Sequence, residues 1–278
     1  MSNINSYIKT KDYLVTKEEF NLVYDAENDM LITKPQPSEL SKYYDPENYI
    51  SHNDQGSTLI EKVYQKVKTY TLNKKVKLIN RYSNLDKTIL DIGCGTGEFL
   101  IYAKNKNWDT YGIEINNGAR KKAEEKKIRT TEKLEDISNK KFNVITLWHV
   151  LEHLPNLEKQ IKKIESLLTK NGTLIIAVPN YKSYDALYYK EHWAAYDTPR
   201  HLWHFSQKSI SNIFQKNHFT VVETLPMHFD SYYVSLLSEK YKNGKTNYIK
   251  AIYRGWLSNM RAKSTGEYSS LIYILQKQ

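Results

Sequence analysis

The residues best suited to chemistry form a glycine-rich turn that follows an acidic residue. Residues 89–100 read ILDIGCGTGEFL, an apolar run that contains Asp91 and then a glycine at every second position. The three glycines are Gly93, Gly95 and Gly97. Glycines at this spacing allow a sharp turn and let a ligand approach the backbone closely. The pattern predicts a buried strand, a loop that cradles a nucleotide, and a helix that starts at Thr96.

The spacing separates this loop from a dinucleotide-binding turn. Such a turn reads GxGxxG, whereas here the third glycine comes one residue early and Glu98 takes the expected position. A second acid, Glu114, lies near the end of the run WDTYGIEI at residues 108–115. It follows the glycines by about twenty residues, where an acid commonly accepts hydrogen bonds from ribose hydroxyls. The alternative is that Glu114 is an ordinary solvated residue at a strand end.

Two stretches resemble motifs of the class I S-adenosylmethionine-dependent methyltransferases. ILDIGCGTGEFL resembles their first motif, and WHVLEHLPN at residues 148–156 resembles the motif after their fourth strand. The resemblance covers about residues 86–219. Within the family, the chain is similar to the bacterial type that includes the ubiquinone-pathway O-methyltransferases. It implies S-adenosyl-L-methionine as cofactor and S-adenosyl-L-homocysteine as product. The cofactor-binding residues that it implies are Asp91, Gly93, Cys94, Gly95, Gly97, Glu114, Ile115, Asp136, Trp148 and His149.

The acid that would lie near the adenine amino group has two candidates. Residues 134–137 read LEDI, so Glu135 and Asp136 both remain open. Two adjacent acids in a polar loop are usually solvated, which is the alternative. The resemblance implies a structural role for His153, which would fix the loop or a helix start, and no chemical role.

Strand and helix patterns alternate along the middle of the chain. The strand-like runs are residues 89–92, 108–115, 142–148 and 172–179. Apolar residues at helical spacing precede the last of these runs. Together with the resemblance, this alternation predicts an α/β fold with a Rossmann-like, doubly wound, seven-stranded and mainly parallel sheet. Residues 218–225 and 268–275 would form its antiparallel C-terminal edge.

The chain is expected to contain three parts. Residues 1–56 would form an N-terminal arm, and residues 57–226 the S-adenosylmethionine-binding core with a lid or substrate insertion at 180–205. Residues 227–278 would form a helical insertion and the final core strand. The arm contains KEEFNLVYDAENDMLITKPQP, which resembles the segment that carries a zinc ribbon in some bacterial methyltransferases. Residues 25–30 replace its cysteines, so we expect no metal there.

Aromatic and titratable residues crowd the predicted insertion after the last of these strand-like runs. An insertion at this place lies over the methyl-donating side of the cofactor in related enzymes, which suggests a substrate pocket or lid. The candidate bases are His201 first, then His149 and His204, and the candidate orienting groups are Tyr196 and Tyr181. Histidine is the natural base near neutral pH. The alternative is a structural subdomain held by an ion pair between Asp197 and Arg200.

A sulfonium cofactor carries an electrophilic methyl group, so the protein must align the acceptor and, for a hydroxyl, remove a proton. We expect methyl transfer to a small-molecule or metabolite acceptor, as O-methylation without a metal. The alternatives are an RNA or protein methyltransferase and a catalytically silent, cofactor-binding regulatory protein. DNA is not expected, because VPNY at residues 178–181 does not match the tetrapeptide of DNA amino-methylating enzymes in position or in prolines.

The composition bears on partners and compartment. The formal net charge is +10, but the lysines are dispersed, so an RNA or anionic lipid partner is left open. The single cysteine, Cys94, excludes an internal disulfide framework and indicates a reducing compartment. No signal peptide or membrane-spanning apolar run is apparent. We expect a cytoplasmic bacterial protein that is a monomer or a homodimer.

Overall fold

Short apolar runs, separated by turns and helices, build two hydrogen-bonded sheets in this chain. The computed structural model describes residues 6–44, 59–83, 86–137 and 140–278, with the backbone alone over residues 59–64. The chain divides into two units. Unit 1 contains residues 1–45, 149–157 and 176–274, and unit 2 contains residues 46–148, 158–175 and 275–278. The expected boundary after residue 56 lies outside the described residues, and the three expected parts stay a prediction.

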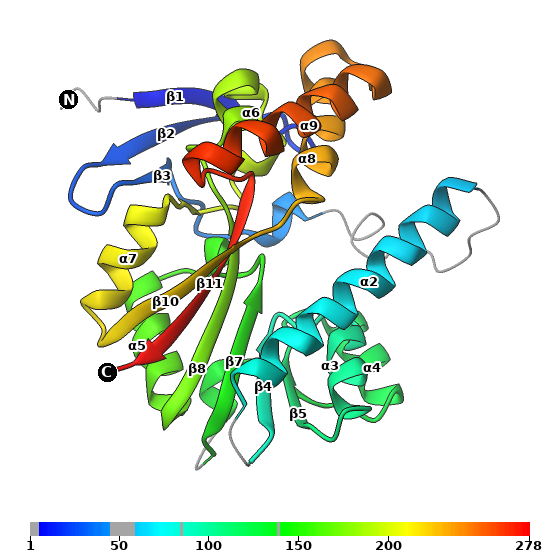
Figure 1. Ribbon diagram of the computed structural model, residues 1–278. Helices are drawn as coiled ribbons and strands as arrows, with labels where there is room; N and C mark the ends of the chain where they lie inside the picture. The colour runs from blue at the N-terminus through cyan, green and yellow to red at the C-terminus, as the bar shows by residue number, and fades with distance from the viewer. Residues whose placement is uncertain (1–5, 45–58, 84–85, 138–139) are drawn as a thin grey trace. The chain divides into compact units, whose positions relative to one another are not determined.

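The larger sheet has seven strands in the order β10-β11-β8-β7-β4-β5-β6. These strands are β4 (Thr88–Ile92), β5 (Asp109–Ile113), β6 (Arg129–Thr131), β7 (Phe142–Trp148), β8 (Leu168–Pro179), β10 (Phe219–Pro226) and β11 (Ser270–Lys277). β4 pairs in parallel with β5 and β7, and β5 pairs in parallel with β6. The mainly parallel sheet with an antiparallel C-terminal edge, seen in Figure 1, confirms the predicted fold class.

The strand order creates a switch point beside β4 in unit 2. From β4 the chain moves outward through β5 and β6, and then returns to the other side of β4 as β7. Ligands in such sheets bind beyond the carboxyl ends of the strands at this reversal. The helices of this part are α2 (Leu59–Arg81), α3 (Glu98–Lys104), α4 (Asn117–Glu125) and α5 (Leu157–Leu167). Ile89, Leu90 and Ile92 of β4 are buried, as their apolar run predicts.

The N-terminal residues form a second sheet that the sequence pattern did not predict. Its order is β1-β2-β3-β9. Its strands are β1 (Ser6–Lys11), β2 (Glu19–Asp25), β3 (Met30–Lys34) and β9 (Trp203–His204). Phe20 and Leu22 are buried on one face of β2, but two such positions are a weak alternation signal. Residues 25–30 join β2 to β3, and no metal-binding cluster involves them among the residues described.

The lysine-rich C-terminal segment, expected as one helical insertion, contains two helices that pack together. They are α8 (Asp230–Asn243) and α9 (Tyr248–Thr265). Gly244 ends α8 with a φ of 73°, and the Asn247 side chain accepts a hydrogen bond from the amide of Lys250 at the start of α9. At Gly255 an added Cβ would lie 2.8 Å from the Tyr232 Cα, so the two helices need glycine at this contact.

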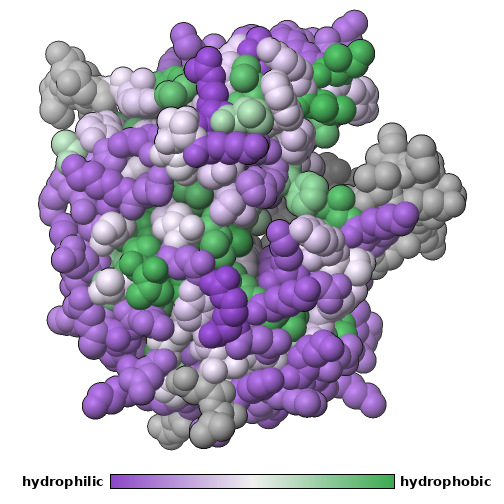
Figure 2. All heavy atoms as spheres, in the orientation of Figure 1, coloured by the Kyte–Doolittle hydropathy of each residue, from purple (hydrophilic) through white to green (hydrophobic). Residues whose placement is uncertain are grey.

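Helix α9 exposes a row of large apolar side chains. They are Ile249, Ile252, Tyr253, Trp256 and Met260, each more than 40% exposed. Figure 2 shows apolar side chains at the surface over α8 and α9. Even so, none of the helices described is both long enough and apolar enough to cross a lipid bilayer.

Candidate active site

The glycine loop between β4 and α3 has the predicted sharp turn. Gly93, Gly95 and Gly97 have φ angles of 72°, 55° and 75°, in the left-handed region that favours glycine. The amides of Gly93 and Cys94 donate to the Ile113 carbonyl at 2.7 and 2.9 Å, which ties the loop to the end of β5. The helix begins at Glu98 rather than at Thr96, because Gly97 is left-handed and serves as the N-cap.

The glycines face different surroundings. An added Cβ at Gly95 would meet no atom within 4 Å, so the backbone at this position borders open space. An added Cβ at Gly97 would lie 3.0 Å from the Ala123 Cβ, so Gly97 instead allows α4 to pack against the loop. Gly95 is therefore the position at which a ligand can reach the loop backbone.

Glu114 joins this open position to the end of β5. Its carboxylate accepts hydrogen bonds from the amide of Gly95 at 2.9 Å and from the amide of Asn116 at 2.8 Å. The residue is only 4% exposed, so it is not an ordinary solvated strand end. Each carboxylate oxygen retains a second lone pair, which a ribose hydroxyl could use. The next residue, Ile115, is 74% exposed and offers an apolar contact beside this carboxylate.

Asp91 supports the loop from inside the sheet. It is 3% exposed, and Thr146 on the neighbouring strand β7 donates a hydrogen bond to it at 2.6 Å. Burial raises the pKa of Asp91 to about 7, against the lowering effects of the Thr146 hydrogen bond and the positive charge of Lys75. This hydrogen bond ties the end of β4 to β7, and a contact of Asp91 with the cofactor stays a prediction. No sequence pattern pointed to Thr146.

Cys94 is buried against Gly112, a glycine to which no sequence pattern pointed. An added Cβ at Gly112 would lie 2.4 Å from the Cys94 Sγ. Gly112 sits in the interior of β5, and glycine within a strand marks such a close approach. Burial raises the pKa of the Cys94 thiol, so the thiol stays protonated and unreactive.

Two further residues of the implied cofactor set lie in unit 2. The Trp148 ring contacts the Phe99 ring edge-on, with centroids 5.8 Å apart, and the Lys75 Nζ lies 4.1 Å from its centroid. The buried Trp148 Nε1 has no hydrogen-bond partner among the described residues, so a ligand could supply one. Asp136 is exposed and accepts a hydrogen bond from the amide of Lys133 at 2.9 Å. Glu135 is exposed as well, and the adenine contact stays a prediction.

His149 begins the part of unit 1 that follows β7, with a φ of 57°. Its Nε2 lies 3.0 Å from Asp230 Oδ2, and its Nδ1 lies 3.4 Å from Glu152 Oε1. Burial disfavours the charged ring, but the two carboxylates outweigh it and raise the pKa of His149 to about 10. His149 is therefore protonated at neutral pH and has no lone pair with which to accept a proton, which argues against it as the base.

The other candidates in unit 1 are largely enclosed. His201 is 8% exposed, and its Nδ1 lies 2.9 Å from the Ala195 carbonyl oxygen. His204 is buried next to the Thr33 hydroxyl, and burial lowers its pKa well below the usual value. Tyr196 is 3% exposed and packs edge-on against Trp193. Tyr181 is also 3% exposed, within the same apolar cluster as Tyr196. The catalytic roles of these residues stay predictions.

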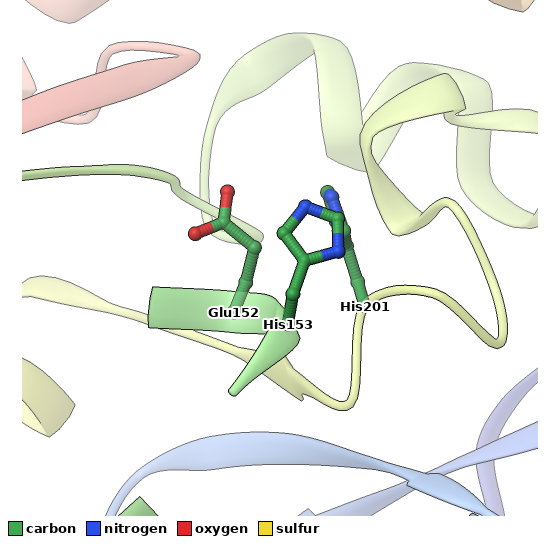
Figure 3. Close-up of side chains that lie close together, drawn as sticks. All are labelled: Glu152, His153 and His201. Atoms are coloured by element: carbon green, nitrogen blue, oxygen red, sulfur yellow. The ribbon is translucent and has the colours of Figure 1, made fainter. Parts of the chain in front are cut away.

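Two neighbours of His201 come from the short helix η3 (Leu151–His153). Figure 3 shows Glu152 and His153 beside the His201 ring. The rings of His153 and His201 are nearly perpendicular, with centroids 4.5 Å apart. Burial and the adjacent His201 lower the pKa of His153 to about 4. Its Nδ1 lies 3.1 Å from the Arg200 carbonyl oxygen, a contact that fits the loop-fixing role implied by the resemblance.

The ion pair between Asp197 and Arg200 is present and belongs to a larger network. The Arg200 Nε lies 3.0 Å from both carboxylate oxygens of Asp197, and its Nη2 lies 3.0 Å from Asp12 Oδ1. The Nη1 donates to the Tyr43 carbonyl at 2.8 Å. Asp12 and Tyr43 lie far from Arg200 in the sequence, so no local pattern pointed to them.

Comparisons with known proteins give three findings. A family model described as a methyltransferase domain matches residues 64–224. A ubiquinone biosynthesis O-methyltransferase of Coxiella burnetii is 26% identical over 109 residues, which cover 35% of this chain and 47% of the relative. The chain thus spans about half the length of the curated relatives it matches.

Among solved structures, the magnesium protoporphyrin IX methyltransferase of Synechocystis PCC 6803 with bound SAH has a TM-score of 0.54 at 16% identity. The alignment covers 81% of this chain and 90% of that one. The cyclopropane synthase MmaA2 of Mycobacterium tuberculosis has a TM-score of 0.52 at 14% identity, with coverages of 73% and 83%. At these identities the likeness concerns the fold.

Proposed function

The chain belongs to the methyltransferase-domain family, and on this premise we propose that it transfers the methyl group of S-adenosylmethionine to an oxygen of a small-molecule acceptor. The observation that carries the proposal is the open space over the Gly95 backbone, beside the buried carboxylate of Glu114. These are the two features that a ligand with a ribose needs at the switch point of such a sheet.

The residues of unit 2 fit the cofactor. The loop at Gly95 would accept its backbone-contacting part, Glu114 would accept hydrogen bonds from the ribose hydroxyls, and Ile115 would cover an apolar face of the adenine. When bound, S-adenosylmethionine supplies a methyl group that is already electrophilic. For the transfer itself, the protein therefore has to align the acceptor and remove a proton from the acceptor hydroxyl.

The choice of oxygen as the methylated atom, and of a small molecule as the acceptor, rests on two further observations. These are the likeness to a ubiquinone biosynthesis O-methyltransferase and the buried cluster of unit 1 that contains the aromatic residues Tyr181, Tyr189, Trp193 and Tyr196. We assign activation of the acceptor to His201, since His149 is protonated at neutral pH and burial lowers the pKa of His204 well below its usual value. Tyr196 would act as an orienting group through its contacts rather than by titration, because burial raises the pKa of its hydroxyl.

Calorimetric titration with S-adenosylhomocysteine, run beside NAD, tests the cofactor assignment. We expect binding of the first alone. Gly95→Val should weaken this binding at least about tenfold, which corresponds to 1.4 kcal/mol, because the side chain would fill the open space and strain a left-handed backbone.

Gly244→Val is the matched control. Gly244 also has a positive φ, 73°, and an added Cβ there meets no atom within 4 Å. It lies at the end of α8, so the variant carries the same backbone strain away from the loop. Equal loss of binding in both variants, or NAD binding by the wild type, would overturn the assignment.

An RNA acceptor is the alternative that the net charge of +10 keeps open. If RNA were the acceptor, its binding would weaken steeply between low and high salt, because phosphate contacts release counterions. Turnover with labelled cofactor that does not change with salt would exclude it. A catalytically silent regulator would bind S-adenosylhomocysteine. It would transfer no labelled methyl group when candidate acceptors are tested with labelled cofactor.

A further inference from the structure

We infer that Glu152, His153 and His201 of unit 1 form a binding site for a divalent transition-metal ion. Each residue offers one ligand atom, and these atoms lie within 4.8 Å of one another. Glu152 and His153 are adjacent on η3, and His201 comes from the loop before β9, as Figure 3 shows. Two imidazoles and one carboxylate, from two separate parts of the chain, thus lie close together.

Both histidines are oriented as metal ligands usually are. The Nδ1 of His153 lies 3.1 Å from the Arg200 carbonyl oxygen, and the Nδ1 of His201 lies 2.9 Å from the Ala195 carbonyl oxygen. A carbonyl only accepts hydrogen bonds, so each Nδ1 carries the proton and each Nε2 keeps its lone pair. Hydrogen bonds of this kind fix the tautomer and the ring orientation of histidines that bind metals.

Glu152 provides a second, independent observation. Its side chain is 1% exposed, and neither carboxylate oxygen has a hydrogen-bond partner among the residues described. Glu152 pairs with His149, whose Nδ1 lies 3.4 Å from Oε1, and the other ring nitrogen of His149 pairs with Asp230. The His149 imidazolium offsets part of the cost of burying this carboxylate, and a bound cation would offset more of it and give the oxygens direct partners.

The donor set selects the kind of ion. Imidazole nitrogen suits zinc, iron, cobalt and similar ions, whereas magnesium and calcium favour oxygen ligands alone. Asp197 Oδ2 lies 3.9 Å from the His201 Nε2, but Arg200 already holds that carboxylate. Three protein ligands leave at least one coordination position for water or a substrate oxygen.

The open position gives the ion a role that rests on the proposed function. An acceptor hydroxyl bound there would have a lowered pKa, and its proton would pass to solvent water. The oxygen lone pair would then form the bond to the methyl carbon while the carbon–sulfur bond breaks, with its electrons going to sulfur. His201 would thus activate the acceptor as a ligand, and the expectation of a metal-free reaction would not hold.

The test is cobalt binding by the full chain after removal of metals with a chelator. We expect one equivalent of Co²⁺ to bind, with visible absorption bands that report imidazole ligands. Glu152→Gln should weaken binding more than about 100-fold, since loss of a direct ligand exceeds the effect of losing a supporting hydrogen bond. Glu239→Gln is the matched control, because Glu239 is also a fully buried glutamate of unit 1 but lies outside the cluster.

His201→Gln is the second variant, in case Glu152→Gln does not fold. It should lose the cobalt bands while it retains the binding of S-adenosylhomocysteine. Binding of one equivalent of Co²⁺ by either folded variant, or no binding of Co²⁺ by the wild type, would overturn the proposed metal site. Binding of S-adenosylhomocysteine by the metal-free wild type is measured separately, so failure of the metal site and failure of the proposed function give different results.

Discussion

At the scale of single residues, glycines decide how the candidate cofactor site is built. Gly95 keeps space open for a ligand, whereas Gly97 and Gly112 let other parts of unit 2 pack closely. The spacing of the loop glycines was visible in the sequence. The need for Gly112 was not, because it depends on Cys94, which approaches it from another strand end only after folding.

Gly112→Ala should destabilise the protein by about 1–3 kcal/mol, because the new methyl group would meet the Cys94 Sγ in a packed interior. Chemical denaturation monitored by circular dichroism measures this loss. Adding Cys94→Ala should restore most of it by removing the sulfur. Gly118→Ala, at an exposed position of α4, is the control and should change stability by less than about 1 kcal/mol. A double variant as unstable as Gly112→Ala would rule out this contact as the cause.

At the scale of elements, the sequence revealed the parallel strands far better than the N-terminal sheet. Strand β7 was predicted with its observed ends, Phe142 and Trp148, because a strand buried on both faces is a continuous apolar run. Strands β1 to β3 are short and only half-buried, and β9 has two residues. Their pairing depends on residues from distant parts of the chain, so no local pattern could reveal it.

The elements of unit 1 meet at Arg200, whose guanidinium contacts Asp12, Asp197 and the Tyr43 carbonyl. Arg200→Leu should lower the free energy of unfolding by about 3–5 kcal/mol, because Asp12 is fully buried and would lose its charged partner. Thermal unfolding measures the change.

Lys216→Leu is the control for this prediction. Lys216 pairs with Glu27, but both side chains are more than half exposed, so removing this pair should cost less than about 1 kcal/mol. If the two variants were equally stable, the Arg200 network would contribute no more than a surface ion pair.

At the scale of the whole molecule, buried carboxylates make the stability of the protein depend on pH. Asp29 is 5% exposed, and burial alone would raise its pKa. Hydrogen bonds from Lys182, Ser206 and Tyr24 outweigh that effect and lower the pKa below its ordinary value. Because its pKa is lower in the folded state, the ionised carboxylate stabilises the protein at pH values above its unfolded-state pKa, about 3.9. This contribution disappears as the pH falls through the folded-state pKa.

Asp29→Asn should therefore be less stable than the wild type at pH 7, and its stability should fall less steeply below about pH 4. Asparagine tolerates the left-handed backbone at this position, where φ is 55°, so the effect reports the lost charge. Denaturation midpoints between pH 7 and pH 3 measure it. Parallel curves for the two proteins would show that Asp29 does not titrate with unfolding.

The division into units also limits how function can be mapped by cutting the chain. Unit 1 draws on three separate stretches, and its strand β3 pairs with β9 from the far side of the sequence. A protein shortened at its N-terminus would lose a partner strand of β9 and the Asp12 partner of Arg200, rather than an independent appendage. If unit 1 binds the acceptor, as the proposed function has it, chimeras that exchange acceptor preference would have to move all three stretches together.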